Sequence, residues 1–370
     1  MTKAAELAKM GEVLTNSQIG GRRNIVINGA MQVAQRGTSF SLSGTADTFI
    51  TDRFLISNSD TGAWTASQST DSPTGFSNSL KMDCTTADTS PTFLTLMTRF
   101  EGQDLQHLKK GTSSAEKTTL SFFVKSNKTG TYIAELRDID NNRTIGKAYT
   151  ISSADTWEQK IITFDGDTTG AFGNDNGNSL QIIWYLAVGS VYNSGTLATS
   201  WGSRVNANTA VGQVNLADST DNEWYITGIQ LEVGSQATPF EHRSFGEEQR
   251  LCQRYAIVYS KNGQPNMGQK AIGTGASTNS SGAYQAFIFP QVTMRAVPTL
   301  TVGGSVSDYE ILKYETGFVD LNSSISLYSA SGRSLFVLAI SSATAEAERG
   351  RDVIMRLEGD NSSLLFDSEL

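Results

Sequence analysis

Three aromatic residues are the best candidates in this chain for contacts with a ligand. Trp201 and Tyr192 lie in stretches rich in Gly, Ser and Asn, a composition typical of loops, and Trp64 is the third candidate. An aromatic ring on a preformed surface can stack on the pyranose ring of a sugar, while short polar side chains bind its hydroxyls. We therefore nominate Trp201, Tyr192 and Trp64 as glycan-binding residues. Packing of each ring within the protein itself remains the alternative.

The other large aromatic residues of this region divide into two groups. Trp157 and Tyr185 are further possible platforms for a sugar ring. Trp184 belongs to the longest apolar set of one parity in the chain, together with Leu180, Ile182, Leu186 and Val188. Such a set predicts a strand with one apolar face. We therefore expect Trp184 to lie in a core and not on a binding surface.

Carboxylates offer weaker evidence for chemistry. Glycoside cleavage needs two carboxylates on either side of the bond. The nearest local pairs are Asp138 with Asp140, Asp165 with Asp167, and Asp218 with Asp221. All lie in turn-like segments, where a carboxylate usually caps backbone N–H groups or faces solvent. The sequence also lacks a Gly-x-Ser-x-Gly nucleophile elbow and a glycine-rich phosphate loop, so no catalytic residue is predicted and the chain is expected not to be an enzyme.

Metal and cofactor sites are not predicted either. The chain has two cysteines, Cys84 and Cys252, and two histidines, His107 and His242, none of them in a zinc-binding spacing. The cysteines lie in what we expect to be different units, so a disulfide is not expected and both are predicted to be buried thiols. His242 follows Phe240 and Glu241 where the chain leaves a strand, and we expect it to make a structural contact.

The elements that must position these residues alternate apolar and polar side chains with a period of two. This pattern predicts eight or more strands between residues 24 and 233, separated by turns rich in Asn, Asp, Gly and Ser. The first strand is expected at Ile25 and Ile27. So many strands in about 220 residues favour a two-layer, jelly-roll-like β-sandwich over residues 23–243. The predicted fold class is all-β.

The stretch 223–243 is the one around which this region is organised. Tyr225, Thr227, Ile229, Leu231 and Val233 share one parity, which predicts a half-buried strand with Gln230 and Glu232 on its other face. Trp224 and Ile226 are apolar on that other face, so the strand is expected to begin buried on both sides and to become one-sided near Gly228. Gly228 is suited to a bulge or to a close backbone approach. Gly234 and Pro239 end the strand, and a unit boundary is expected after Arg243.

Three segments lie outside the predicted sandwich. Residues 1–22 begin with a short amphipathic helix and are expected to attach the chain to a larger assembly or to dock on its own body. In residues 244–260, Ser244 and Glu247 form a capping-box pattern, which predicts a connecting helix. Residues 261–370 are expected to form a second β-sandwich domain, because short strand patterns recur there with no solenoid period.

The composition of the chain limits the classes of partner that it can bind. The chain has 370 residues, a net charge of −8 and an isoelectric point near 5.0, and the basic pairs Arg22-Arg23 and Lys109-Lys110 are isolated. Binding to nucleic acid is therefore not expected, because phosphate neutralisation needs clustered Lys and Arg. No apolar run is long enough for a membrane span, and the first residues lack a signal-peptide core, so we expect a chain made in a cytoplasm.

Three motifs carry a resemblance to a known family. They are NIVINGAMQVAQRG at 24–37, EWYITGIQLEVGSQATPFEHR at 223–243 and GEEQRLCQRY at 246–255. In this order they resemble virion proteins of tailed bacteriophages, described as tail fibres or structural proteins and frequent in marine phages. The resemblance covers residues 23 to 260 and, more weakly, the remainder, including FPQVTMRAVPT at 289–299.

The middle of the chain is also similar to carbohydrate-binding jelly rolls, in which the first and last strands are neighbours beside a structural calcium. Here Met31 and Gln32 stand where an acidic ligand is expected, and Thr227 and Gly228 stand where those modules often carry aspartates. The resemblance therefore implies the fold, but these positions do not supply the acidic ligands for calcium.

The resemblance implies a structural component of a phage virion, such as a tail fibre used for host attachment, with no enzymatic activity. It further implies a homotrimer that contacts other virion proteins through its N-terminal segment and host surface polysaccharide through a distal domain. The open alternatives are a capsid-decorating or adaptor protein that binds no sugar, and a glycan depolymerase.

Overall fold

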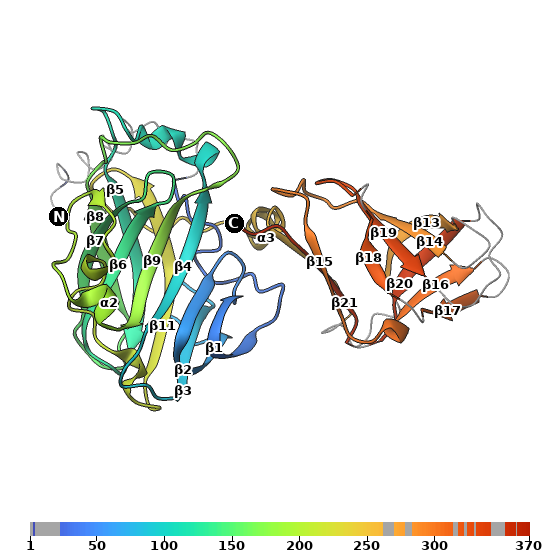
Figure 1. Cartoon of the computed structure of the whole chain (residues 1–370), viewed down its shortest axis with the longest axis horizontal. Helices are drawn as coiled ribbons and strands as arrows, with labels where there is room; N and C mark the ends of the chain where they lie inside the picture. Colours follow the sequence, from blue (N-terminus) through green and yellow to red (C-terminus); the bar gives the residue numbers. More distant parts are fainter. Residues whose placement is uncertain are drawn as a thin grey trace. The chain divides into compact units, whose positions relative to one another are not determined.

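The computed structural model describes residue 3, residues 23–261, 270–277, 283–313, 317–321, 324–328, 331–341, 352–359 and 361–370. This part of the chain is nearly all β, as predicted, and forms two compact units (Figure 1). The first unit ends at Glu248 and includes Leu370, and the second runs from Gln249 to Glu369. Apart from Lys3, the predicted attachment segment 1–22 lies outside the described residues.

The first unit is built from eleven strands joined by short loops and single helical turns. The strands are β1 (Ser39–Phe49), β2 (Leu55–Ser69), β3 (Ser79–Thr86), β4 (Phe93–Glu101), β5 (Thr118–Ser126), β6 (Gly130–Asp138), β7 (Arg143–Ile151), β8 (Glu158–Phe164), β9 (Asn178–Val188), β10 (Gly202–Ser203) and β11 (Glu223–Val233). The helical turns are η1 (Gly102–Leu108), α2 (Ser190–Asn193), η2 (Asn206–Asn208) and η3 (Leu216–Asp218).

The long strand β2 divides this continuous sheet into two layers. Its first half pairs with β4 and its second half with β3, and the strand kinks between them at Asp60 and Gly62, which have φ angles of 49° and 65°. The front layer has the order β10-β7-β6-β9-β4-β2, and the back layer has the order β2-β3-β11-β5-β8 (Figure 1). The strand β1 pairs along β2.

The two layers pack face to face over one apolar core. Trp184 of β9 meets Phe122 of β5 with ring centroids 5.8 Å apart, and Phe122 also contacts Tyr149 of β7 at 5.1 Å. Trp184 is fully buried, which confirms its assignment to the core. Cys84 lies in the same core, and burial raises the pKa of its thiol to about 11.

The strand β11 lies in the middle of the back layer and is buried on both faces. A bulge at Gly228, with a φ of 62°, shifts the register with β5 between Thr227 and Gln230. Because the bulge inserts one residue, Trp224 and Ile226 before it face the same core as Ile229 and Leu231 after it. The prediction of a single apolar parity from Tyr225 to Val233 was therefore wrong, although the bulge itself was expected.

The other face of β11 is covered by the chain that follows it. Thr238 donates from its backbone N–H to a carboxylate oxygen of Glu232 at 2.7 Å, and the N–H of Glu241 donates to the side-chain oxygen of Gln230 at 2.8 Å. Gln230 and Glu232 are consequently buried. The strand is buried on both faces before Gly228, as predicted, but it does not become one-sided after Gly228. His242 packs against the rings of Phe240 and Phe76, the structural contact that was predicted.

Residues 23–38 contain no strand, contrary to the expectation from Ile25 and Ile27. They lie instead against the bulge of β11, where the Asn24 side chain bonds the carbonyl of Ile229 and the N–H of Leu231 at 3.0 and 3.1 Å. The backbone of Gly29 accepts a hydrogen bond from the N–H of Ile229 at 2.9 Å. A bulge interrupts regular pairing, so side-chain bonds replace a ladder here.

Arg243 completes this closure. Its guanidinium, which is 5% exposed, donates to the carbonyl oxygens of Asn24 and Val26 and pairs with Glu248 at 3.3 Å. The positive charge between the first and last segments of the sandwich is therefore that of the Arg243 side chain.

The connecting helix is shorter than predicted. The helix α3 spans Phe245–Gln253, and Ala256–Ser260 form the strand β12, which pairs with β21 (Ser363–Asp367). The pattern was misleading because the buried residues Cys252, Tyr255 and Ala256 fit both a helical stripe and a strand entrance. Among the described residues no helix is long and apolar enough to cross a lipid bilayer.

The second unit is a β-sandwich with its own core, also as predicted. A sheet of the order β12-β21-β15 faces a larger sheet of the order β17-β16-β20-β13-β14-β19-β18. The remaining strands are β13 (Lys270–Ser277), β14 (Ala283–Ile288), β15 (Thr299–Gly303), β16 (Tyr309–Lys313), β17 (Gly317–Asp320), β18 (Ile325–Leu327), β19 (Phe336–Ser341) and β20 (Asp352–Leu357). Cys252 is buried in this unit, and neither cysteine is in a disulfide.

The closure at β11 predicts a specific sensitivity at Gly29. A Cβ atom there would lie 2.1 Å from the carbonyl oxygen of Ile229, so Gly29→Ala should lower the free energy of unfolding by about 2 kcal/mol or more. All five tryptophans belong to the first unit, so denaturation followed by tryptophan fluorescence measures this unit alone. Gly202→Ala is the matched control, because nothing lies within 4 Å of its Cβ position. Equal midpoints for both variants would contradict the proposed closure.

Candidate functional site

Trp64 does not lie on a surface. It is 1% exposed in the core between the two layers, and its ring N–H donates to the carbonyl oxygen of Thr61 at 2.7 Å. Neither face of the ring can reach a sugar, so the nomination of Trp64 was wrong. Trp64 shares its parity with the core residues Ile56 and Ala66 of the same strand, and all three face the core.

Trp201 lies at one end of the sandwich, beside the loops that follow β4 and β8. Its ring is partly buried against the core, its N–H donates to the carbonyl oxygen of Asp165 at 2.6 Å, and the Lys110 ammonium lies 5.5 Å from the ring centroid. These contacts fix the orientation of the ring.

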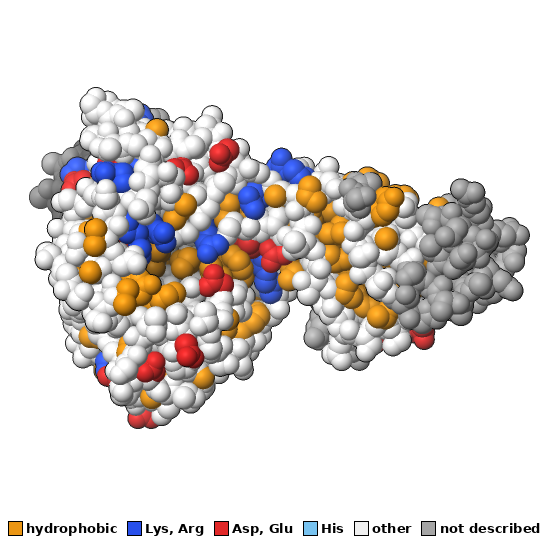
Figure 2. All heavy atoms as spheres, viewed as in Figure 1, with side chains coloured by type: hydrophobic (Ala, Val, Ile, Leu, Met, Phe, Trp, Pro, Cys, Tyr) orange, Lys and Arg blue, Asp and Glu red, His pale blue; other side chains and the backbone are white. Residues whose placement is uncertain are grey.

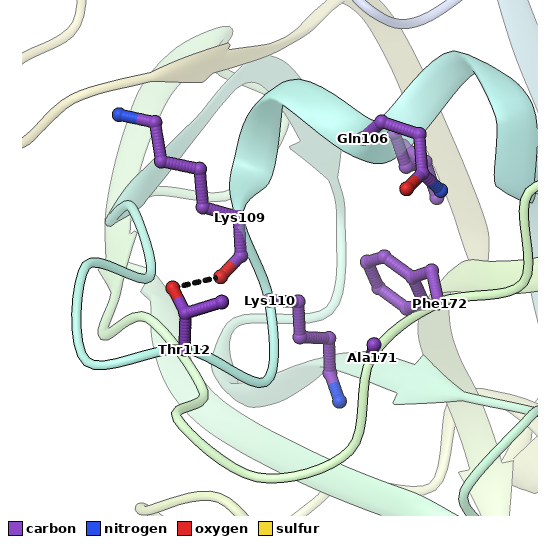
Figure 3. A pocket seen from close by; sticks show the side chains of 7 residues that line it. Gln106, Lys109, Lys110, Thr112, Ala171 and Phe172 are labelled. Carbon is purple, nitrogen blue, oxygen red and sulfur yellow. Dashed lines mark hydrogen bonds between the residues drawn. The ribbon is translucent and has the colours of Figure 1, made fainter.

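A cavity of about 400 Å³ opens near this end of the unit. It is lined by residues of η1 and of the loops after β4 and β8, namely Leu105, Gln106, Lys109, Lys110, Thr112, Ala171 and Phe172. Figure 3 shows Phe172 between Gln106 and Lys110, with the side chains of Lys109 and Lys110 pointing in opposite directions. A cation and an aromatic ring therefore share one wall of the cavity.

Lys110 is held by an ionic network. Its side chain is 4% exposed, and the ammonium pairs with Asp138 at 2.5 Å and with Asp167 at 3.1 Å. Arg143 binds both carboxylate oxygens of Asp167, at 2.7 and 2.9 Å. Burial alone raises the pKa of Asp167, but the hydrogen bonds from Arg143 and Lys110 outweigh it and hold the pKa below its ordinary value.

The polar groups around this cavity are thus occupied by the protein. Lys110 also donates to the carbonyls of Thr169 and Gly170, and Gln106 donates to those of Gly102 and Gly173. Buried groups with complete hydrogen bonding stabilise loops and leave little for a ligand to bind. We regard the network as the support of the loop end.

Tyr192 leads to a different surface. It lies in α2 and contacts Phe93 of β4 edge to face, with ring centroids 5.4 Å apart. Both residues border the outer face, our name for the side of β4, β9 and β6 that points away from the core. Its residues are Thr95, Met97, Arg99, Glu135, Arg137, Gln181, Ile183 and Tyr185.

The strand register brings polar side chains together in one row of the outer face. Gln181 on β9 lies opposite Arg99 on β4 and opposite Arg137 on β6. The side-chain oxygen of Gln181 and the Nε of Arg137 are both buried and have no hydrogen-bond partner in the described part of the chain. The hydroxyl of Thr95, on the same face, is also buried and also has no hydrogen-bond partner among the described residues.

The neighbouring carboxylate is fully engaged. Glu135 accepts hydrogen bonds from the hydroxyls of Tyr185 and Thr144, and Arg204 pairs with it at 3.1 Å. Burial and the adjacent Glu135 raise the pKa of the Tyr185 hydroxyl. Burial lowers the pKa of Arg204, but Glu135 and Tyr185 outweigh this effect and raise it above the ordinary value. Tyr185 is 2% exposed, so it supports the face and does not serve as a platform.

Apolar side chains lie beside the polar row. Ile133, Ile183, Tyr185, Val188 and Ala210 form a small cluster, packed against Phe93, Met97, Tyr192 and Leu197. Phe93, Met97, Arg137 and Tyr192 are partly exposed. Figure 2 shows basic and hydrophobic side chains gathered over β6, β9 and β4. The outer face therefore combines apolar contact area with polar atoms that lack partners.

Tyr192 was expected at a binding surface from the sequence, whereas Arg137 and Gln181 were not. Their parity was available, because each has the opposite parity to the core residues Leu136, Leu180 and Ile182. Their meeting in one row depends on the pairing of β4, β9 and β6, which are not consecutive in the chain.

Two other clusters are self-contained. Trp157 donates to Asp71 at 3.0 Å, and Lys125 lies over the rings of both Trp157 and Tyr225. In the second unit, carboxylate oxygens of Glu310, Asp320 and Glu358 lie within 4.8 Å of one another, but Arg356 already pairs with Glu310. Neither arrangement leaves an evident place for a ligand.

Comparison with known proteins gives similarity of structure alone. No family model matches the sequence, and no curated protein does. A tailspike domain of bacteriophage CBA120 is 15% identical with a TM-score of 0.31, covering 57% of this chain and 21% of that chain. A family 11 carbohydrate-binding module of Clostridium thermocellum is 11% identical with a TM-score of 0.28, covering 59% of this chain and 100% of the module. A xylan-binding domain of Paenibacillus barcinonensis is 9% identical with a TM-score of 0.27, covering 59% and 100%.

The ionic network at the loop end predicts a large effect of one substitution. Lys110→Met leaves Asp138 and Asp167 buried without their ammonium partner, so the first unit should lose about 3–5 kcal/mol of stability at pH 7. The pKa of Asp167 is depressed, so its stabilising contribution exists above the unfolded pKa of about 3.9 and is lost as the pH falls through the folded value. The difference between wild type and variant in urea denaturation should therefore narrow below about pH 4.

Lys109→Met provides the control for this experiment. Its ammonium pairs with Glu116 at 2.5 Å, but its side chain is 54% exposed, and a surface pair contributes about 1 kcal/mol or less. Equal losses for the two variants would show that Lys110 is not the centre of a buried network.

Proposed function

We propose that this chain is a non-enzymatic structural component of a tailed-phage virion, a tail fibre or similar appendage, that binds host surface glycans through the outer face of its first unit. The capsid-decorating or adaptor role is the alternative, and it predicts no sugar binding at this face. The observation that carries the proposal is the group of unpartnered polar atoms on a rigid sheet beside partly exposed aromatic and aliphatic side chains.

Each part of this surface suits a sugar. Tyr192, Phe93 and Met97 offer apolar area for the carbon face of a pyranose. Gln181 and Thr95 offer hydrogen-bonding atoms that lack partners, and a buried polar atom without a partner costs about 1–3 kcal/mol. These atoms are buried in the free protein, so a sugar hydroxyl reaches them only when the side chain rotates outward, and the bond it supplies then removes this cost. Ligand sites usually combine apolar walls with a few such polar groups on a preformed surface.

Binding without cleavage fits the state of Glu135. A general acid or nucleophile must be able to reach the glycosidic bond, and a second carboxylate must face it. Glu135 is 0% exposed and already bonds Tyr185, Thr144 and Arg204. Its role on this face is to orient its neighbours.

The virion part of the proposal is supported by the three sequence motifs at 24–37, 223–243 and 246–255. The first two motifs contact each other in the structure. Asn24 and Gly29 of the first motif form hydrogen bonds to β11, which belongs to the second motif. The third begins in α3, and its Glu248 accepts from the backbone N–H of Asn28. The first two motifs and the start of the third therefore lie in the first unit.

Replacing the unpartnered groups should separate binding from stability. Gln181→Met and Thr95→Val remove polar atoms that lack hydrogen bonds, so the first unit should keep or raise its unfolding midpoint. Binding to host polysaccharide, measured by pull-down and by isothermal calorimetry, should weaken about three- to tenfold for each variant. Loss of stability without loss of binding would contradict the site.

Thr119→Val is the matched control for this pair. Thr119 is also a buried threonine in a strand, but its hydroxyl donates to the carbonyl oxygen of Gly234 at 2.8 Å. This variant should lose about 1 kcal/mol of stability and keep its affinity for the polysaccharide.

The proposed appendage should be a homotrimer. Light scattering of the purified chain should give three times the chain mass of 39.9 kDa, independent of concentration over the micromolar range. A monomer that also fails to bind host polysaccharide would favour the adaptor or decorating role.

A further inference from the structure

We infer that the glycan bound by the outer face is anionic, and that Arg137 pairs with its carboxylate or sulfate group. This inference rests on the proposed function and adds the substrate class. The observation behind it is a partly exposed guanidinium with no ion pair among the described residues, in register with an amide oxygen that has no hydrogen-bond partner there either.

Arg137 is fixed in place by the sheet. It lies on β6 between Gln181 on β9 and Thr144 on β7, in a row that continues to Arg99 on β4. Its Nε is buried and has no hydrogen-bond partner within the described residues. The backbone on either side is held by pairing to both neighbouring strands, so the orientation of the side chain does not depend on a loop.

The charges around Arg137 do not neutralise it. Glu135 is the carboxylate that attracts it, but Arg204 already pairs with Glu135 at 3.1 Å and repels Arg137. The hydroxyls of Tyr185 and Thr144 use Glu135 as their acceptor as well. One carboxylate therefore faces two guanidinium groups, and Arg137 is the one left without a bond to it.

Burial lowers the pKa of Arg137, and repulsion by Arg204 lowers it further. Both effects mean that the charged form is held at a cost in free energy, which an added anion would offset. The chain as a whole carries a net charge of −8. General attraction of polyanions is therefore disfavoured, and selective binding must come from a local site such as this one.

The chemistry of Arg137 and Gln181 indicates which class of sugar they would bind. A guanidinium presents N–H donors in a planar fork, which matches two oxygens of a carboxylate or sulfate. The adjacent oxygen of Gln181 can accept from a hydroxyl of the same sugar, and Tyr192 and Met97 can contact its carbon face. A uronic acid residue and a sulfated sugar both carry this combination, and a neutral hexose lacks the anion.

The test compares three polysaccharides of matched length on the full chain at about 0.15 M salt, where long-range surface attraction is largely screened. One is a polyuronate, one is a sulfated galactan and one is neutral dextran, and binding is measured by calorimetry and by the shift of the unfolding midpoint. We expect the wild type to bind at least one of the anionic polymers at least tenfold more tightly than dextran, and the better of the two identifies the anion.

Variants at Arg137 test whether this residue causes the preference for anionic polysaccharides. Arg137→Met should abolish the preference for the anionic polymer while keeping the unfolding midpoint, because the side chain makes no Nε hydrogen bond to lose. Arg137→Lys keeps the charge but loses the fork, so it should retain only part of the preference. Lys117→Met is the control for net charge, since Lys117 is 56% exposed and pairs with Asp165 at the surface.

The outcomes separate the two proposals. Equal binding of dextran and the anionic polymers, unchanged in Arg137→Met, would overturn the anionic preference and leave glycan binding intact. Binding of none of the three would overturn both. A preference for anions that Lys117→Met removes as fully as Arg137→Met would show that general charge, and not Arg137, is responsible.

Discussion

The first unit depends on the closure between residues 24–29 and the bulge of β11. A bulge in a central strand leaves backbone groups without a ladder partner, and each buried group of this kind costs free energy. Asn24 and Gly29 supply the missing partners from the other end of the sandwich. Arg243 then binds the carbonyls of the same segment with a guanidinium. The first and last segments of the sandwich, separated by about two hundred residues, are thereby fixed to each other.

This closure has consequences for the opposite layer. The side chains of β11 pack in the same core as Trp184 of β9, so the position of the back layer sets the position of the front layer. The front layer in turn carries Gln181, Arg137 and Thr95 on its outer side. A sheet held in this way keeps its side chains at defined spacings, which lowers the entropy lost when a rigid ligand binds.

The two surfaces of the first unit differ in the bonding state of their polar side chains. Around Lys110, the ammonium has two carboxylates and two carbonyls as partners. On the outer face, the amide oxygen of Gln181 and the Nε of Arg137 have none among the described residues. The cavity of about 400 Å³ lies near Lys110, whereas the proposed glycan site is the outer face.

The sequence by itself determined the all-β class, the two buried cysteines, the core position of Trp184 and the bulge at Gly228. These features depend on local signals, because alternation, glycine placement and apolar parity are read within one strand. It misplaced Trp64 because an aromatic residue among polar neighbours fits a surface as well as a core, although Trp64 shares the parity of the core residues Ile56 and Ala66. It misplaced the faces of β11 because a bulge reverses parity and its effect depends on the partner strand. The row of Arg99, Gln181 and Arg137 was decided only by the tertiary structure. The three residues come from strands that are far apart in the chain, and their register is set by packing over the shared core.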